Sequence, residues 1–184
     1  MTDPRSLVRP ATVRDVDTIA SIYAQVVRDT SASFEETPPT RVEILRRMAA
    51  PPRLPWLVAE HRSRIAGYAY ASRHRQRPAY RWSADCSIYL DPGHRFVGLG
   101  RLLYERLITE LAELGYVSLF AAIALPNPAS VRLHEALGFE ALGVFRRVGY
   151  KHGAWHDVEW WQRRLADPPD DPSEPHEWRP GGPS

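Results

Sequence analysis

The sequence predicts a mixed α/β fold in a single domain. Short strand-like runs alternate with amphipathic helical runs, and two of the strand-like runs are joined by a short connection typical of a hairpin. Near the middle of the chain, a strand-like run leads into a glycine loop that opens a helix. The predicted order is a strand, two helices, three strands, a helix, a strand, a helix and two strands.

The composition is that of an ordinary soluble globular protein. Of 184 residues, 43% are apolar and 25% are charged, and the net charge is only +2, so nothing demands a nucleic-acid partner. The basic runs 73–81 and 146–151 are typical of solvated faces. No apolar run has the length of a membrane span, and the N-terminus lacks an apolar signal core, so we expect a cytoplasmic protein. A single cysteine excludes an internal disulfide framework and a cysteine-based zinc cluster.

The first third of the chain predicts a strand and two helices. Residues 7–9 form a short strand, and Thr12 with Asp15 resembles a capping box before an amphipathic helix that runs to about Arg28. The segment 30–39 is loop-like, and Thr40 caps a short helix that ends near 49, before two prolines.

The middle third contains the hairpin and the glycine loop. Strands are expected at 56–60, 65–71 and, after the basic linker 73–81, at 83–90. A helix then starts near Gly100, with leucines at helical spacing on one face, and Gly115 ends it.

The last third predicts three strands and a helix. The apolar run 117–124 is typical of a strand covered on both faces. Asn127 is an N-cap before a helix that ends at Gly138, and strands follow at 139–149 and 155–164. We therefore expect a folded domain over 1–165. The proline-rich and acidic segment 166–184 is predicted to be a disordered tail.

The glycine loop suits a phosphate group. Gly98 and Gly100 let the backbone approach a ligand closely, and the following helix start presents unpaired N–H groups. No Gly-Lys-Ser/Thr follows, which excludes a Walker loop, and Leu103 at the third glycine position argues against a dinucleotide fingerprint. Alone, the loop is equally compatible with a plain tight turn.

Several segments together resemble the acetyl-CoA-binding core of the GNAT N-acetyltransferase superfamily. Arg95, Gly98 and Gly100 follow a strand, and Asn127 precedes a helix that ends at Gly138. More closely, the chain is similar to the phosphinothricin N-acetyltransferases and the methionine sulfoximine acetyltransferases related to them. The segments that carry this similarity are Phe34, 36–38, 55–60, 79–82, 98–100, 125–128, 134–138 and 151–158, within about residues 6–164.

The resemblance implies a fold, a reaction and partners. The GNAT fold is a mixed, mostly antiparallel sheet of about seven strands, flanked by about four helices. The implied reaction is direct transfer of acetyl from acetyl-CoA, in a ternary complex and without a metal, to the amine of phosphinothricin, methionine sulfoximine or methionine sulfone. Masking that amine would confer resistance to the herbicide or antibiotic. A homodimer is also expected.

The resemblance assigns catalytic roles to two residues. The family's catalytic Glu falls at Asp85, and a carboxylate there could accept a proton from the amine, directly or through water. The shorter side chain of Asp favours a water relay. His134 stands where many members of the superfamily carry a Tyr, and an imidazole suits acid–base work on the leaving thiolate.

The resemblance also implies binding residues. A backbone N–H near the end of the strand 83–90 would bind the developing oxyanion. The residues expected to bind acetyl-CoA are Ile88, Tyr89, Leu90, Arg95, Phe96, Val97, Gly98, Leu99, Gly100, Arg101, Asn127 and Ser130. Those expected to bind the acceptor, through its acidic groups or as a wall, are Phe34, Arg75, Arg77, Tyr80 and Tyr89.

Purely structural roles stay open for some of these residues. Asp85 could pair with an arginine of 73–81, Phe34 could plug the space under its loop, and the arginines could be solvated. Cys86 with His134 as base would allow an acetyl-cysteine intermediate, although Asp85 and Cys86 are strand neighbours that point to opposite faces, so Cys86 is expected in the core.

The sequence does not favour a metal site, and it leaves two other functions open. His152 and His156 lack a third metal ligand at suitable spacing and are interpreted as hairpin and pocket-edge residues. Alternative functions are acetylation of another amine, such as a protein N-terminus, and a module that binds acetyl-CoA or amino acids without turnover.

Overall fold

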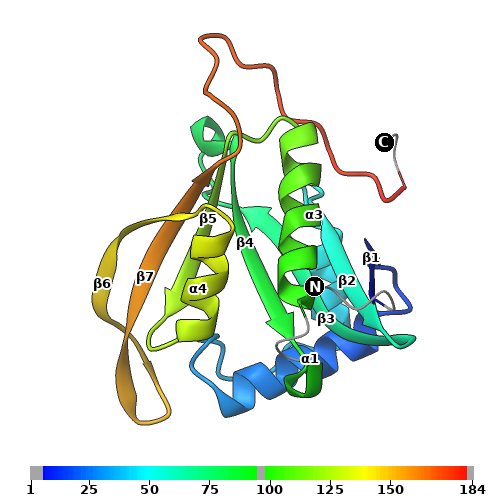
Figure 1. Cartoon of the computed structure of the whole chain (residues 1–184), viewed down its shortest axis with the longest axis vertical. Coiled ribbons are helices and arrows are strands. Elements are labelled where there is room, and N and C mark those ends of the chain that lie inside the picture. Colours follow the sequence, from blue (N-terminus) through cyan, green and yellow to red (C-terminus); the bar gives the residue numbers. More distant parts are fainter. Residues whose placement is uncertain (1–5, 95–97, 182–184) are drawn as a thin grey trace.

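A computed structural model describes residues 6–94 and 98–181 of the chain, which form one sheet with helices on both faces (Figure 1). The elements are β1 (Ser6–Pro10), α1 (Val16–Asp29), α2 (Arg41–Met48), β2 (Trp56–His61), β3 (Arg64–Arg73), η1 (Pro78–Tyr80), β4 (Ser83–Leu90), η2 (Pro92–His94), α3 (Leu99–Glu113), β5 (Ser118–Ala124), α4 (Pro128–Ala136), β6 (Glu140–Lys151) and β7 (Ala154–Arg164). This order confirms the predicted mixed α/β fold.

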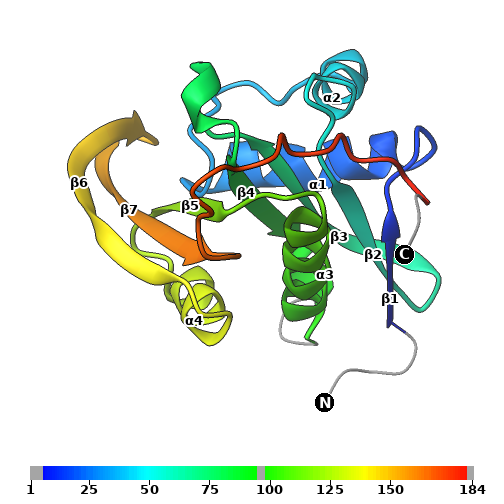
Figure 2. The same cartoon turned by 90° about the horizontal axis from the view of Figure 1, so that it is seen from above.

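The seven strands have the order β1-β2-β3-β4-β5-β7-β6. Every pair is antiparallel except β4 with β5, so the sheet is mostly antiparallel, as expected. Figure 2 shows α1 and α2 on one face of the sheet and α3 and α4 on the other. Two separate apolar cores result, one under α1 and α2 and one under α3.

The helices follow the patterns that predicted them. In α1, the buried residues recur at helical spacing from Val16 to Val27, and in α3 Leu103, Leu107 and Leu111 face the core. Thr40 caps α2 by accepting the N–H of Glu43 at 3.2 Å. The helix α1 starts later than a capping box at Thr12 would place it, because its N-cap is Asp15, whose carboxylate accepts the Thr12 N–H at 2.7 Å and no N–H of the helix.

The parallel pair β4–β5 opens the sheet. Its register covers only residues 83–85 against 118–120, after which β4 pairs with β3 alone and β5 with β7 alone. Parallel strands that stop exchanging hydrogen bonds leave unpaired edges and a gap between them. The sheet is thus split from Cys86 onward.

The prediction that the strand 117–124 is covered on both faces is wrong. Leu119, Ala121 and Ile123 are buried against the α3 side, but Phe120 is partly exposed and Ala122 is exposed. The helices α1 and α2 pack over β2 to β4, so the other face of β5 stays open beside the split. An apolar run in a strand therefore does not require two covered faces.

The C-terminal segment, for which the sequence predicts a disordered tail, is described up to residue 181. Residues 166–181 have no regular secondary structure, in keeping with their composition, but they contact the domain. Trp178 is 6% exposed and its indole N–H donates to Glu110 Oε2 at 2.6 Å, while the His176 N–H donates to Leu114 O at 2.8 Å. The composition of this segment is mostly polar, but its one buried tryptophan provides an apolar contact with the domain.

Candidate active site

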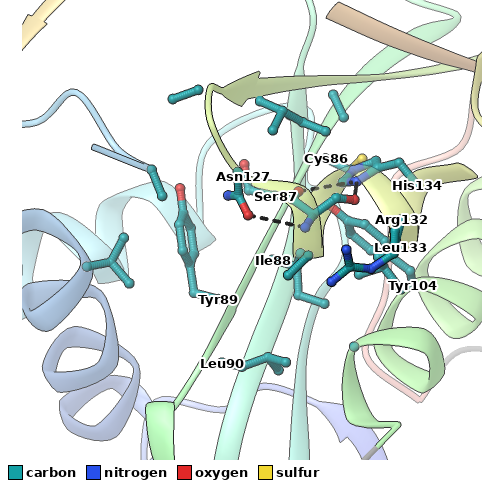
Figure 3. A pocket seen from close by; sticks show the side chains of 18 of the residues that line it. Cys86, Ser87, Ile88, Tyr89, Leu90, Tyr104, Asn127, Arg132, Leu133 and His134 are labelled. Carbon is teal, nitrogen blue, oxygen red and sulfur yellow. Dashed lines mark hydrogen bonds between the residues drawn. The ribbon is translucent and has the colours of Figure 1, made fainter. Parts of the chain in front are cut away.

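The split in the sheet forms a cleft of about 630 Å³ (Figure 3). One wall is the end of β4 from Cys86 to Leu90, and the other is β5 from Ala121 to Ala124. The N-terminus of α3, the helix α4 and the loop residues 30–32 complete it. The end of β4 and the glycines Gly98 and Gly100 therefore line one cavity, whereas Asp85, one residue before that part of β4, is not among the lining residues.

The helix α3 begins at the cleft with an unblocked N-terminus. Gly98 is its N-cap with φ +83°, a left-handed conformation that favours glycine, and no side chain of the described residues caps the helix. Its first N–H groups have no intrahelical partner and carry the positive end of the helix dipole. A methyl group on Gly100 would lie 3.3 Å from Leu133 Cδ2, so glycine allows α3 and α4 to approach closely.

The structure brings most of the predicted acetyl-CoA residues to this cleft. Gly98, Gly100, Arg101, Asn127 and Ser130 line it, as do the β4 residues 88–90. The side chain of Leu99 is 1% exposed in the core, so only its backbone could serve a ligand. The predicted residues Arg95, Phe96 and Val97 lie outside the described residues. Asn127 Oδ1 accepts the Ser130 N–H at 3.2 Å and fixes the start of α4.

His134 lies on the inner face of α4 with a defined tautomer. Its Nδ1 is 2.8 Å from Ser130 O, and because a carbonyl only accepts, Nδ1 carries the proton and donates it. The other nitrogen, Nε2, is buried without a hydrogen-bond partner among the described residues. Burial lowers the pKa of His134, so the imidazole is neutral near pH 7 and Nε2 is a free acceptor.

Asp85 lies on the opposite face of β4, where it pairs with a histidine rather than an arginine. Its Oδ1 is 2.6 Å from Nδ1 of His74, and the His74 ring stacks on Phe120 with the ring centroids 4.2 Å apart. Burial raises the pKa of Asp85, and the hydrogen bond from His74 opposes part of that rise. The carboxylate is thus partly desolvated but held in one orientation.

Sequence patterns did not single out His74. It follows the end of β3, and the register places Ser72 opposite Asp85, so the next residues of the linker pass over the carboxylate. The hairpin between β3 and β4 could have indicated this neighbour, because antiparallel pairing brings the residues after one strand close to the start of the next. The basic composition of 73–81 pointed to its arginines instead.

Alternation along β4 separates two chemical environments. Cys86, Ile88 and Leu90 belong to the core under α3, whereas Tyr89 packs with the core under α1 and α2. Figure 3 shows His134, Cys86 and Tyr104 together at one side of the cleft and Tyr89 at the opposite side. The cleft therefore connects the two faces of the sheet.

Cys86 is a core residue, as predicted. It is 6% exposed, its thiol donates to Phe120 O at 3.4 Å, and burial raises its pKa to about 12. Tyr104, which no sequence motif marked, hydrogen-bonds this thiol and packs edge-on to His134 with centroids 5.2 Å apart. An aromatic residue one turn into the helix that follows the glycine loop was the available signal.

The predicted acceptor residues lie outside the lining of the main cleft, apart from Tyr89. Arg75 and Tyr80 surround His74: the Arg75 guanidinium lies 5.5 Å from the Trp160 ring, and the Tyr80 ring is 5.9 Å from that of His74. Arg77 precedes the short turn η1 and is exposed. Phe34 packs on β6 and lies 6.1 Å from the His156 ring.

The described residues hold neither a metal cluster nor a membrane-spanning helix. Among residues 6–94 and 98–181, no three His, Cys, Asp or Glu side chains are grouped as a metal site would require. Within the same part of the chain, no helix is both long and apolar enough to cross a bilayer.

A comparison with known protein families identifies the class of protein. The model of the acetyltransferase (GNAT) domain matches residues 8–160, which is most of the chain. The chain therefore belongs to the GNAT acetyltransferase family, and the resemblance seen in the sequence is confirmed.

Proteins similar to this chain are named as acetyltransferases for phosphinothricin or for methionine sulfoximine and methionine sulfone. The chain is 41% identical over 167 residues to the phosphinothricin N-acetyltransferase of Streptomyces viridochromogenes, covering 88% of this chain and 90% of that one. It is 34% identical to the L-methionine sulfoximine/L-methionine sulfone acetyltransferase of Salmonella typhimurium, covering 87% and 95%. The crystal structure of a phosphinothricin acetyltransferase from Sinorhizobium meliloti in complex with AcCoA matches with a TM-score of 0.86 and 37% identity, covering 94% of both chains.

Proposed function

We propose that this enzyme moves the acetyl group of acetyl-CoA to the amine of a small amino-acid-like acceptor, of the phosphinothricin, methionine sulfoximine or methionine sulfone type. Transfer would be direct, within a ternary complex. The observation that carries the proposal is the cleft at the split between β4 and β5, which is lined by the N-terminus of α3 and by the end of β4. The partly buried carboxylate of Asp85 lies on the same strand, one residue before the part of β4 that lines the cleft.

The cleft fits a CoA thioester. The free N–H groups after Gly98 suit a pyrophosphate, and the unpaired β4 edge at 88–90 offers backbone N–H groups for a carbonyl oxygen. Arg101 lies at the same rim of the cleft. Acetyl-CoA, when bound, supplies an acetyl group activated as a thioester. The chain's own residues then have to orient the amine and move its proton.

Asp85 is the proton acceptor in this proposal. A free α-amino group is mostly protonated at pH 7, so it must lose a proton before it can attack. The raised pKa of Asp85 makes its carboxylate a better base than an exposed Asp, and His74 holds it on the acceptor side of the sheet. Because the Asp side chain is short, a bridging water would complete the reach.

His134 would act on the leaving thiolate, on the face of the sheet that α3 and α4 cover. In the resting enzyme, Nε2 of His134 carries no proton and is buried, and the imidazole ring packs against Tyr104. It could therefore take up a proton or accept a hydrogen bond from the S–H group of CoA. This refines the role predicted from the sequence, because a neutral imidazole must receive a proton before it can donate one.

The acceptor's acidic groups would meet Arg75, Arg77 and Tyr80. These residues follow β3 on the same side as Asp85, and the pair of guanidinium groups suits a carboxylate and a phosphinate or sulfoximine oxygen. Phe34 and Tyr89 would form the apolar wall.

We further propose a homodimer that works in the cytoplasm, where acetyl-CoA is available. Five large apolar side chains of the β6–β7 hairpin are each more than half exposed: Leu142, Phe145, Val148, Tyr150 and Trp155. Apolar surface of this kind usually lies in an interface. Light scattering of the purified protein and of Phe145→Glu tests this: a dimer that the substitution dissociates supports it, and a monomeric wild type contradicts it.

The decisive experiment measures CoA release. Purified enzyme is given acetyl-CoA and a panel of phosphinothricin, methionine sulfoximine, methionine sulfone, unmodified methionine and a peptide with a free N-terminus, and kcat/KM is compared. We expect the first three to be preferred, because each combines an amine, a carboxylate and a second oxygen-bearing polar group within a single amino acid. Preference for the peptide would favour the protein N-terminus alternative. Acetyl-CoA binding without CoA release on any amine would indicate a binding module.

A further inference from the structure

Lys151 is the single lysine among the 24 lysine and arginine residues of the chain. It is the last residue of β6, and only 6% of its surface is exposed. Burying an ammonium costs free energy unless its protons are hydrogen-bonded, so the partners of Lys151 show what it holds together.

The Lys151 ammonium joins two backbone carbonyls next to the cleft. Its Nζ donates to Val27 O at 2.7 Å and to Ser33 O at 2.6 Å. Val27 lies in the last turn of α1, where carbonyls without helical partners attract a cation, and Ser33 lies in the loop after α1. A compact ammonium with rotatable donors fits between two such carbonyls, whereas a planar guanidinium does not. This explains a lysine here in a chain that otherwise uses arginine.

Two residues close to Lys151 in the β6–β7 hairpin, Gly149 and His152, also contact the loop after α1. A side chain at Gly149 would overlap the ring of Phe34, so the absence of a Cβ gives that ring its place on β6. On the other side, His152 Nε2 lies 3.3 Å from Thr30 O. Three residues of the β6–β7 hairpin thus contact the loop segment 30–34.

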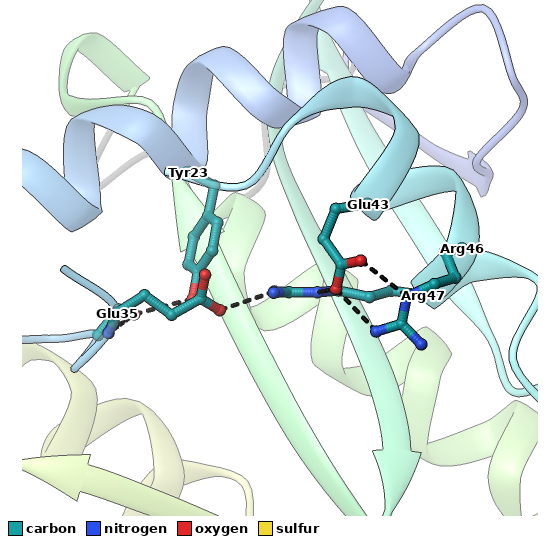
Figure 4. A network of polar contacts seen from close by, with 6 residues as sticks. Tyr23, Glu35, Glu43, Arg46 and Arg47 are labelled. Carbon is teal, nitrogen blue, oxygen red and sulfur yellow. Dashed lines mark hydrogen bonds and ion pairs between the residues drawn. The ribbon is translucent and has the colours of Figure 1, made fainter. Parts of the chain in front are cut away.

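The loop is also held from its own helices (Figure 4). The Tyr23 hydroxyl lies 2.8 Å from Ser33 Oγ and 3.0 Å from Glu35 Oε1, and Arg47 donates to the same Glu35 oxygen at 2.7 Å. These contacts hold the loop against α1 and α2. The contacts of Lys151, together with those of Gly149 and His152, tie it across to the β6–β7 hairpin, and Lys151 alone among these three makes charged hydrogen bonds to it.

Residues 30–32 of this loop line the cleft, near Tyr89. We propose that Lys151 is a positioning residue for the acceptor: it clamps the end of α1 and the loop 30–34 to the β6–β7 hairpin and thereby fixes the acceptor-side wall of the cleft. The inference rests on the proposed function and names a residue that controls it. Lys151 has no proposed contact with acetyl-CoA. Its substitution should therefore change the KM for the acceptor and leave the KM for acetyl-CoA nearly unchanged.

The test is a comparison of KM values for Lys151→Met, Lys151→Arg and the control Arg146→Met. Arg146 is on the same hairpin, but its ion pair with Asp157 stays within the hairpin. Lys151→Met should raise the acceptor KM by about tenfold, the scale of one charged hydrogen bond, and change the acetyl-CoA KM by less than about twofold. Lys151→Arg should not restore the wild-type value, and Arg146→Met should match the wild type. An unchanged acceptor KM, or an equal rise in both KM values, would overturn the proposal.

A second measurement uses the wild type and so does not depend on the variants folding. With lysine labelled by ¹⁵N at Nζ, the single lysine gives a single ammonium signal. We expect its protons to exchange slowly, and the signal to shift when methionine sulfoximine binds but not with CoA alone. Fast exchange like that of free lysine would refute the clamp. If the wild type releases no CoA with any amine, the proposed function fails, whereas the exchange rate still decides whether the clamp exists.

Discussion

The two faces of the sheet meet at the cleft but differ in chemistry. On the α3–α4 face, His134 is 2% exposed among Tyr104 and Phe139, and its free nitrogen is uncharged. On the α1–α2 face, Asp85 is paired with His74 next to exposed arginines, and its carboxyl side chain is 29% exposed. The first environment is apolar and closed, and the second is charged and open to solvent.

In the proposed reaction, the two faces would have different tasks. A thioester is neutral and gains from a dry, preorganised site, whereas an ammonium acceptor has to lose a proton to a base, directly or through a water molecule. The single strand β4 serves both because successive side chains alternate between its faces. The following substitutions each break one side of this comparison.

The largest effect is expected for Asp85→Asn. The amide keeps the shape of the carboxylate but cannot accept the proton of the amine, so kcat should fall by about 10²- to 10⁴-fold. The dissociation constant for acetyl-CoA, measured by calorimetry, should stay nearly the same because Asp85 is not among the residues that line the cleft. Unchanged turnover would remove Asp85 from the role of base.

His134→Phe should have the next largest effect. Phenylalanine keeps the packing against Tyr104 and Phe139 but removes Nε2, and we expect kcat to fall by about tenfold to a hundredfold, at the lower end of acid–base contributions. Steady-state kinetics test this, and a thermal unfolding midpoint close to that of the wild type shows that packing is intact. Wild-type kcat in the folded variant would make His134 structural.

His74→Phe should shift the pH profile rather than abolish activity. The hydrogen bond from His74 lowers the pKa of Asp85 against the effect of burial. Its loss raises that pKa further, so the carboxylate ionises at higher pH and the acid limb of kcat/KM moves upward. Activity should therefore fall more at pH 6 than at pH 8. A limb that stays in place or moves down would show that Asp85 does not set it.

Cys86→Ser should have the smallest effect. The thiol is buried, its pKa is raised to about 12, and it already donates to Phe120 O, so it is a poor nucleophile. Turnover should change by less than about twofold, which is within the usual range for a near-isosteric substitution. Mass spectrometry of the wild type quenched with acetyl-CoA checks the same point: an acetylated Cys86 would overturn direct transfer.

Local patterns were sufficient for the elements and for part of the site. Helical spacing located α1 and α3, Asn127 located the start of α4, and alternation separated Asp85 from Cys86 on opposite faces. Such patterns depend on contacts between residues that are close in the chain, so they can be recognised in the sequence. The resemblance to a family then selected Asp85 and His134 from the other titratable residues.

Other features depend on residues far apart in the chain. The His74–Asp85 pair requires the β3–β4 register, and the clamp of Lys151 on Ser33 joins positions 118 residues apart. The exposed face of β5 and the burial of Trp178 likewise depend on which elements pack nearby. The composition of a segment does not contain this information.

The sequence by itself determined the order of the elements, the glycine at the start of α3 and the family of the enzyme, because these follow from local patterns and short motifs. Only the tertiary structure decided that β4 and β5 separate after Asp85. It also decided that His134 is neutral and that His74 holds the carboxylate. The physical reason is that pKa values and hydrogen-bond partners depend on burial and on neighbours brought together by folding.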